Sequence, residues 1–255
     1  DLVAHWIMDG NANDTSPHGQ DNSGTTVSDA EFVLDPERGQ VLSLDGTTDY
    51  VDVADSSDIN LGVHGQRTIS LWFKADQVTS RQVLFEEGGG TRGLVIYVEN
   101  GLLYMGGWNR PSNQSGWTGT WISTAVTAGQ WHNAALTLDG GSTVQPDALK
   151  GYLNGQLYAS GDGSQLWQHS GDIGIGRNDG AARYHNGNSS TQRAFAGLMD
   201  DVRIYNRVLN GSELSTLAAS GSSTGMTVVL PSNGSSASAR ARVFAQITAT
   251  FPFGQ

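Results

Sequence analysis

The chain has 255 residues, a formal net charge of −11 and no cysteine. The acidic balance argues against nucleic acid or an anionic membrane as a partner. No apolar run approaches the ~20 residues of a membrane-spanning helix, and the lack of cysteine excludes a disulfide framework. Hydrophobic residues make up 37% of the chain, charged residues 15%, and 34 residues are glycine. This composition favours many short strands joined by tight turns within one large all-β domain.

Residues 2–8 are predicted to form a strand that leads into an oxygen-rich loop over residues 9–16. The loop opens with the spacing Asp-x-Asn-x-Asn, which imitates the start of an EF-hand, where alternate side chains converge on calcium. The pattern then departs from an EF-hand, because its sixth position is Asp14 in place of glycine and its twelfth is Gln20 in place of glutamate. A free-standing EF-hand is therefore not expected.

The middle of the chain carries the alternation of half-buried strands. Ile69, Leu71 and Phe73 share one face of a predicted strand, with polar and aromatic residues between them. Two Asn-Gly dipeptides, at 100–101 and 154–155, each lie between strand-like runs and predict type I′ hairpins.

Two polar loops, residues 106–121 and 177–188, carry the residues that suit a ligand. The first holds three tryptophans among Asn, Gln, Arg and Ser, where a solvated loop normally has none. An aromatic face packs against the C–H side of a sugar ring, while planar amide and guanidinium groups reach its hydroxyls. The candidate ligand-binding residues are Trp108, Asn109, Arg110, Arg177, Asn178, Tyr184 and His185. The alternative is that both loops are solvated connectors whose tryptophans close the edge of the fold.

A last strand is predicted over residues 197–206, followed by a short helical segment. Val202 and Ile204 alternate with polar residues, which places Asp200 on the apolar side of this strand. An ionised carboxylate there is costly unless a metal, a cation or several N–H donors compensate it.

The run Gly-Leu-Met-Asp-Asp-Val-Arg-Ile-Tyr-Asn-Arg-Val-Leu at 197–209 resembles the end of the laminin-G-like jelly-roll domains, within the concanavalin A-like lectin/glucanase group. Six earlier segments resemble the same family in the right order: 42–46 (Leu-Ser-Leu-Asp-Gly), 49–53 (Asp-Tyr-Val-Asp-Val), 68–74 (Thr-Ile-Ser-Leu-Trp-Phe-Lys), 129–136 (Gly-Gln-Trp-His-Asn-Ala-Ala-Leu), 151–155 (Gly-Tyr-Leu-Asn-Gly) and 173–176 (Ile-Gly-Ile-Gly). The resemblance implies an all-β, two-sheet antiparallel β-sandwich. We expect this jelly roll over residues 1–218, and a Gly/Ser-rich linker with extra strands or the start of a further segment over 219–255.

The resemblance also implies that the first and last strands are antiparallel neighbours, so that Asp9 and Asp200 meet. Two carboxylates repel unless a cation joins them, and hard oxygen ligands without His or Cys nearby favour Ca²⁺. The predicted metal ligands are Asp9, Asn11, Asp14 and Asp200. The alternative is an Asx-turn, in which these side chains accept hydrogen bonds from backbone N–H groups.

The leading functional hypothesis is a calcium-dependent or calcium-stabilised carbohydrate-binding, lectin-like module of a larger extracellular adhesin or polysaccharide-active protein. Its partner would be a glycan or polysaccharide. The chain opens on Asp1 and not on Met, so we expect a piece of a longer, secreted multidomain protein.

Two other classes stay open. A glycoside hydrolase or polysaccharide lyase of the same fold would typically present Glu-x-Asp-x-x-Glu along a strand, and the sequence has no such run. Glu86 and Glu87 are adjacent, so their side chains point apart, and catalysis is not expected. The third class is a protein–protein adhesion module. In this sequence, only the aromatic loop favours glycan binding over protein binding.

Overall fold

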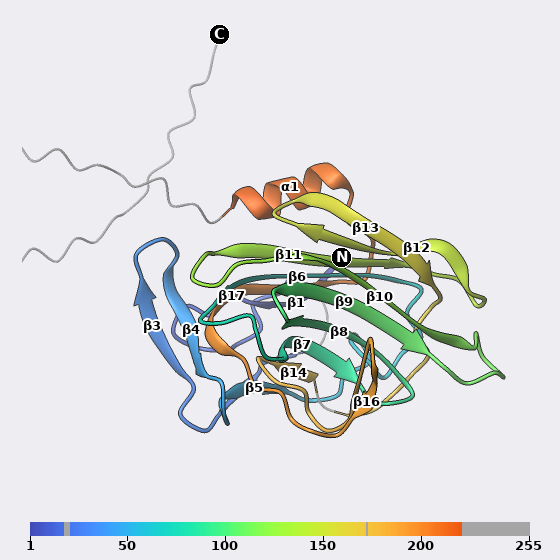
Figure 1. Ribbon diagram of the computed structural model, residues 1–255, viewed down its shortest axis with the longest axis horizontal. Coiled ribbons are helices and arrows are strands. Elements are labelled where there is room, and N and C mark those ends of the chain that lie inside the picture. Colours follow the sequence, from blue (N-terminus) through green and yellow to red (C-terminus); the bar gives the residue numbers. More distant parts are fainter. Residues whose placement is uncertain (18–20, 172, 221–255) are drawn as a thin grey trace, which may run out of the picture. The chain divides into compact units, whose positions relative to one another are not determined.

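The computed structural model describes residues 1–17, 21–171 and 173–220, and this part of the chain is almost entirely β-structure (Figure 1). Its strands are β1 (Leu2–Trp6), β2 (Thr25–Val27), β3 (Glu31–Asp35), β4 (Gly39–Asp45), β5 (Tyr50–Val53), β6 (Gln66–Ala75), β7 (Gln82–Gly88), β8 (Arg92–Glu99), β9 (Leu102–Asn109), β10 (Trp117–Ala125), β11 (His132–Asp139), β12 (Gln145–Leu153), β13 (Gln156–Gly163), β14 (Ile173–Ile175), β15 (Ala182–Tyr184), β16 (Gly187–Ser189) and β17 (Ala196–Tyr205). The helix α1 (Gly211–Ala219) follows the last strand. Within the described residues, no helix is long and apolar enough to cross a membrane.

The strands form two large antiparallel sheets that pack face to face. One sheet has the order β13-β12-β11-β6-β17-β4-β3, with β1 also paired to β17. The other has the order β10-β9-β8-β7-β14-β5-β2, and β15 pairs with β16 in a separate hairpin. Several neighbours, such as β6 and β17 or β7 and β14, are far apart in sequence, as expected for a jelly roll. The predicted all-β, two-sheet sandwich is confirmed.

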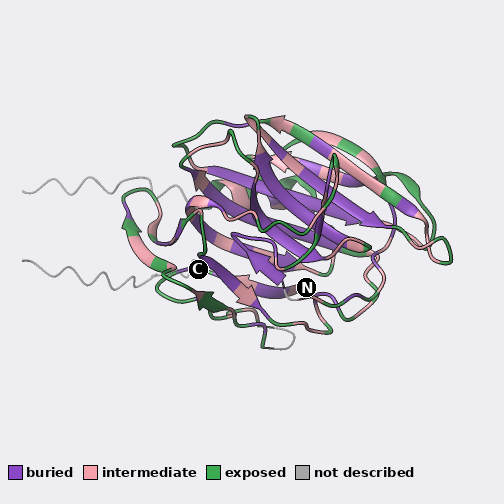
Figure 2. Ribbon diagram, turned by 60° about the horizontal axis from the view of Figure 1, so that its bottom comes forward, coloured by how far each residue is buried: buried purple, intermediate pink, exposed green. Residues whose placement is uncertain are grey.

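The core lies between the two sheets and follows the predicted alternation. Ile69, Leu71 and Phe73 of β6 are completely buried in one large apolar cluster, together with side chains from the facing sheet such as Ile96 and Met105. Figure 2 shows buried strands through the middle of the sandwich and exposed residues mainly in the loops at its rim. Because the core fixes the strands, the loops at the rim are held on a rigid support.

Both predicted Asn-Gly hairpins are present. Asn100 and Gly101 have φ of 51° and 77° between β8 and β9, and Asn154 and Gly155 have 50° and 76° between β12 and β13. Positive φ at both central residues is the requirement of a type I′ turn, and Asn followed by Gly meets it at low cost.

The two ends of the jelly roll meet as predicted, since β1 pairs antiparallel with β17 in a register that includes Trp6 opposite Val202.

The helix α1 begins at a capping box: the Asn210 side chain accepts from the N–H groups of Ser212 and Glu213, and the Glu213 carboxylate accepts from the Asn210 N–H at 2.8 Å. The helix runs one residue past the predicted boundary at 218. Beyond Ser220, the predicted segment 219–255 lies outside the described residues.

Candidate functional site

The predicted aromatic loop is largely strand, and its first tryptophan is part of the core. Trp108 lies in β9, is completely buried, and donates from Nε1 to the carbonyl oxygen of Gly89 at 2.7 Å. Asn109 is also completely buried. Trp108 packs in a second apolar cluster on the outer face of the sheet, which the β15–β16 hairpin covers with Ala182 and Tyr184. Trp108 as an exposed platform for a sugar was therefore a wrong prediction, whereas Arg110 is exposed.

The second predicted loop is also mostly turned inward. Asn178 is buried and holds the loop together, donating to the Gly180 carbonyl at 2.7 Å and accepting from the Arg193 N–H at 2.8 Å. Arg177 lies over the Tyr50 ring, its guanidinium carbon 3.7 Å from the ring centroid. The prediction that Arg177 and Asn178 are exposed to a ligand is therefore wrong, because both side chains pack inside the protein.

Tyr184 is completely buried, and burial raises the pKa of its phenol. Its predicted role as a platform is wrong as well, because the ring meets Tyr97 edge to face at 5.1 Å inside the covered cluster. His185 is exposed and stacks on Tyr104 with the ring centroids 4.6 Å apart. The loops do meet, since Arg183 lies 5.4 Å from the Trp121 ring. Of the predicted ligand-binding residues, Arg110 and His185 are the exposed ones.

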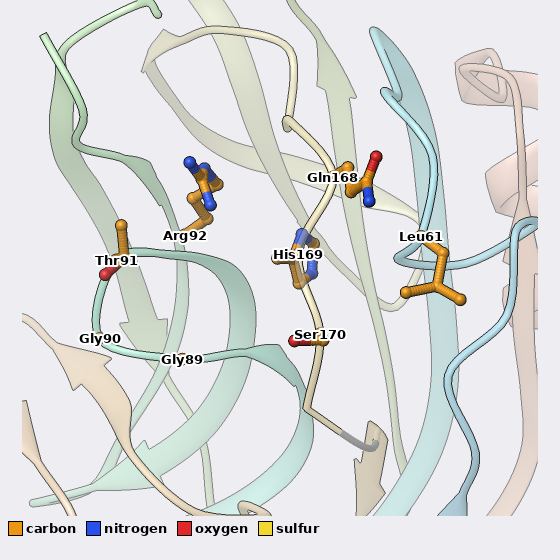
Figure 3. Close-up of a pocket in the computed structure, with 8 residues that line it drawn as sticks. All are labelled: Leu61, Gly89, Gly90, Thr91, Arg92, Gln168, His169 and Ser170. Carbon is orange, nitrogen blue, oxygen red and sulfur yellow. The ribbon is translucent and has the colours of Figure 1, made fainter. Parts of the chain in front are cut away.

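A pocket of about 370 Å³ lies beside the turn between β7 and β8. In Figure 3 this turn forms one wall and the segment 168–170 forms the other, with Leu61 beyond it. The pocket is lined by Leu61, Gly89, Gly90, Thr91, Arg92, Gln168, His169 and Ser170. Gly88 opens the turn with a φ of 112°, and a side chain there would meet the Arg92 carbonyl oxygen at 2.3 Å, so the tight turn requires glycine.

His169 lines the pocket with a mostly buried ring, one nitrogen of which has no hydrogen-bond partner among the described residues. The residue is 8% exposed, and its Nδ1 lies 3.0 Å from the carbonyl oxygen of Trp167. A carbonyl can only accept, so Nδ1 carries the proton and Nε2 of the neutral ring is an acceptor. Nε2 is buried and unpartnered in this part of the chain. Because this atom has almost no contact with solvent, it points into the protein and not into the open pocket.

The other polar groups of the pocket are donors or can act as either donor or acceptor. Arg92 is oriented by a hydrogen bond from its Nε to the Gln114 side-chain oxygen at 2.9 Å. Thr91, Gln168 and Ser170 are exposed at the rim, where each presents a hydroxyl or an amide. No lining residue carries a carboxylate.

A buried charged layer lies near the pocket, between the sheets. Arg67 and Glu87 are both completely buried, and Arg67 donates from Nη1 to the Asp58 carbonyl oxygen at 3.0 Å. Burial raises the pKa of Glu87, and the positive charge of Arg67 opposes that effect. The neighbouring Glu86 is also completely buried, and burial together with the charge of Glu87 holds its pKa well above the ordinary value.

The predicted calcium ligands are engaged by the protein itself. Asp14 accepts at Oδ1 from the N–H groups of His5 at 2.9 Å and Ser16 at 2.8 Å, and at Oδ2 from the N–H of Asn22 at 3.3 Å. The Asn11 side chain accepts from the Asn13 N–H at 2.9 Å. These contacts are those of the Asx-turn alternative.

Asp200 is paired with a cation of the chain, since its Oδ2 accepts from Arg38 Nε at 2.7 Å. Asp9 is exposed. Among the described residues, no group of three or more His, Cys, Asp or Glu side chains is placed to hold a metal. The four predicted ligands therefore do not fit a ready-made calcium site, and calcium binding stays a prediction.

The sequence contains little that indicates which residues line the pocket. The Gly88-Gly89-Gly90 run is typical of a turn, but nothing local in the sequence indicates that Arg92 and the segment 168–170 lie at one pocket. The cue that existed was a polar Gln168-His169-Ser170 run directly after two apolar residues, close to a predicted strand.

Comparison with known proteins agrees with the fold. The family model Laminin_G_3, described as the concanavalin A-like lectin/glucanases superfamily, matches residues 45–215. No curated protein sequence gives a significant match.

Among solved structures, domain 4 of AbnA, a GH43 extracellular arabinanase from Geobacillus stearothermophilus in complex with arabinotriose, is similar with a TM-score of 0.63 and 20% identity, over 86% of this chain and 98% of that chain. The binding domain of Paraclostridial Mosquitocidal Protein 1 has a TM-score of 0.64 and 17% identity, over 86% of this chain and 52% of that one. The botulinum neurotoxin serotype G binding domain has a TM-score of 0.62 and 14% identity, over 86% and 51%. The chain thus spans about half the length of these two toxin chains, and identities this low show the shared fold alone.

Proposed function

Because the chain belongs to the concanavalin A-like lectin/glucanases superfamily, we propose that it is a non-catalytic carbohydrate-binding module that holds a saccharide in the pocket beside the β7–β8 turn. The observation that carries this proposal is a concave site whose polar side chains are imidazole, amide, hydroxyl and guanidinium and include no carboxylate. A sugar hydroxyl can donate to the side-chain oxygen of Gln168 and accept from Arg92 at the same time.

The size and support of the pocket fit this function. Its volume of about 370 Å³ falls within the range of small-ligand sites. Its walls come from a turn anchored by two core strands and from a segment whose His169 N–H donates to the Asn60 carbonyl oxygen at 2.9 Å. The similar arabinanase domain was solved with arabinotriose, which supports a saccharide as the ligand class.

Binding is favoured over hydrolysis by the position of the carboxylates. A retaining glycosidase needs two carboxyl groups about 5 Å apart at the scissile bond. Glu86 and Glu87 are completely buried, and the residues that line the pocket include no Asp or Glu. The pocket therefore offers hydrogen bonds to a sugar but not the pair of carboxyl groups that a retaining glycosidase uses.

The cellular setting is part of the same proposal. We propose a module of a secreted, multidomain adhesin or polysaccharide-active protein, in line with the extracellular arabinanase and the toxin binding domains that share its fold. Calcium would act on stability and not in the pocket, since the predicted ligands Asp9, Asn11, Asp14 and Asp200 are not among the residues that line it.

A glycan array tests the proposal directly. The protein is applied with calcium and with EDTA, and each hit is then incubated with the protein while reducing ends are measured. We expect binding to at least one glycan class without the release of new reducing ends. Release of product would establish an enzyme, and an array without hits in either buffer, from a protein that melts cooperatively, would favour the protein–protein adhesion module.

A further inference from the structure

Three arginines surround the turn that forms one wall of the pocket. Arg92 lines the pocket, and Arg110 donates from Nη1 to the Gly90 carbonyl oxygen at 3.2 Å. Arg183 reaches the same turn through Asn188: its Nη1 donates to the Asn188 side-chain oxygen at 2.8 Å, and Asn188 lies beside Gly90. We name Arg92, Arg110 and Arg183 the arginine cluster.

The positive charge of the arginine cluster is not compensated within the described part of the chain. Arg92, Arg110 and Arg183 bond to an amide, a carbonyl and another amide, and none of them forms an ion pair there. Burial lowers the pKa of Arg183, and the nearby positive charge of Arg110 lowers it further.

Four other described arginines are paired with carboxylates, whereas Arg67, Arg177 and Arg193 form no ion pair with the described residues. Arg38 pairs with Asp200 at 2.7 Å, Arg81 with Glu99 at 2.8 Å and Arg207 with Glu213 at 2.7 Å. The chain carries 25 acidic residues against 14 Lys and Arg, so acidic partners are abundant. The arginine cluster thus places three guanidinium groups without a paired carboxylate around this turn, and one of them, Arg92, lines the pocket.

From this arrangement we propose that the pocket selects saccharides that carry an oxyanion, either the carboxylate of a uronic acid or a sulfate ester. The inference rests on the proposed function and names its ligand class. A planar guanidinium pairs with two oxygens of a carboxylate or sulfate at once, which gives both affinity and orientation. The ligand group would neutralise the repulsion between Arg110 and Arg183, while the amide and hydroxyl groups at the rim hold the sugar hydroxyls.

The test compares polymers with one backbone: dextran, carboxymethyl-dextran and dextran sulfate, each immobilised for biolayer interferometry at 0.15 M NaCl. The variants are Arg110→Gln and Arg183→Gln. The matched control is Arg207→Gln, which removes the same charge from a partly exposed ion pair with Glu213, directly after β17. Each variant is first shown to melt like the parent. Arg110 is exposed, so its substitution keeps the test valid even if Arg183→Gln disturbs the packing on Trp121.

We expect one or both anionic polymers to bind more tightly than dextran, and each cluster variant to bind that polymer about fivefold or more weakly, as the loss of one charge-assisted hydrogen bond implies. Preference for carboxymethyl-dextran or for dextran sulfate identifies the oxyanion. The inference is overturned if neither anionic polymer binds more tightly than dextran, or if Arg207→Gln weakens binding as much as Arg110→Gln. A protein that still binds neutral glycans on the array would then keep its proposed function without the preference for acids.

Discussion

Arg38 and Asp200 form a buried ion pair between two tryptophans. Arg38 Nε donates to Asp200 Oδ2 at 2.7 Å, and the side chains are only 4% and 8% exposed. The guanidinium carbon lies 4.0 Å from the centroid of the Trp72 ring and 5.3 Å from that of Trp131. The carboxylate that the sequence places on the apolar side of the last strand is thus paired with a cation from the β3–β4 turn, 162 residues away in the chain.

Removal of Arg38 should destabilise the protein strongly. Arg38→Ala leaves Asp200 buried without its cation, and we expect a loss of about 3–5 kcal/mol in the free energy of unfolding at pH 7. Arg207→Ala breaks an exposed pair and should cost at most about 1 kcal/mol. Urea denaturation at pH 7 measures both. Equal small losses for the two variants would show that the buried pair contributes little.

The same pair predicts a pH dependence of stability. Burial raises the pKa of Asp200 from 3.8 to about 6, and the charge of Arg38 offsets only part of this rise. The folded state therefore holds the proton more firmly than the unfolded state, so this stabilisation is complete below pH 3.8 and is lost as the pH rises through 6. Asp200→Asn does not titrate, so it should cost more at pH 4 than at pH 7.5, by up to about 3 kcal/mol. A larger cost at pH 7.5 would mean that Arg38 outweighs burial.

Asp14 should stabilise the first loop through its hydrogen bonds. Asp14→Ala removes the acceptor for the N–H groups of His5, Ser16 and Asn22, and we expect a loss of about 1–3 kcal/mol. Thermal melting of this variant, of Asp9→Ala and of the parent in calcium and in EDTA separates this effect from the predicted calcium site. Bound calcium would contribute on the order of 3–4 kcal/mol at 100–1,000 times its dissociation constant, so EDTA would lower the parent midpoint by several degrees. A midpoint that EDTA does not change leaves hydrogen bonding as the role of Asp14.

Trp108 should behave as a core residue. Trp108→Ala removes a completely buried indole and its hydrogen bond to Gly89, so we expect a loss of about 3–5 kcal/mol in the free energy of unfolding. Urea denaturation monitored by circular dichroism measures it, with His185→Ala as the exposed comparison expected within about 1 kcal/mol. An unchanged unfolding midpoint for Trp108→Ala would restore the prediction of an exposed platform.

Features encoded by neighbouring residues could be predicted from the sequence. The alternation in β6, the positive φ values at Asn100-Gly101 and the pairing of β1 with β17 all follow from local patterns or from the family resemblance. The cost of burying Asp200 was also predictable, because strand alternation fixes the side on which a residue lies.

Features that depend on distant segments could not be predicted in this way. Trp108 is buried because the β15–β16 hairpin, more than 70 residues later in the chain, covers the outer face of its sheet. The partner of Asp200 comes from a turn near the start of the chain. The pocket unites Leu61, Arg92 and His169, which no spacing in the sequence relates.

The central claim, a saccharide in the pocket beside the β7–β8 turn, is tested most directly by filling that pocket. Ser170→Trp places a large side chain at an exposed position that lines the pocket. As the control, Ala128→Trp places the same side chain in the exposed turn between β10 and β11. This turn is held to the end of β6 that lies opposite Arg67, because the N–H of Gly129 donates to the carbonyl oxygen of Ala75. Both variants are titrated calorimetrically with the best glycan from the array. We predict that Ser170→Trp binds at least tenfold more weakly while Ala128→Trp binds as the parent does; parent-like binding by a folded Ser170→Trp protein would contradict the account.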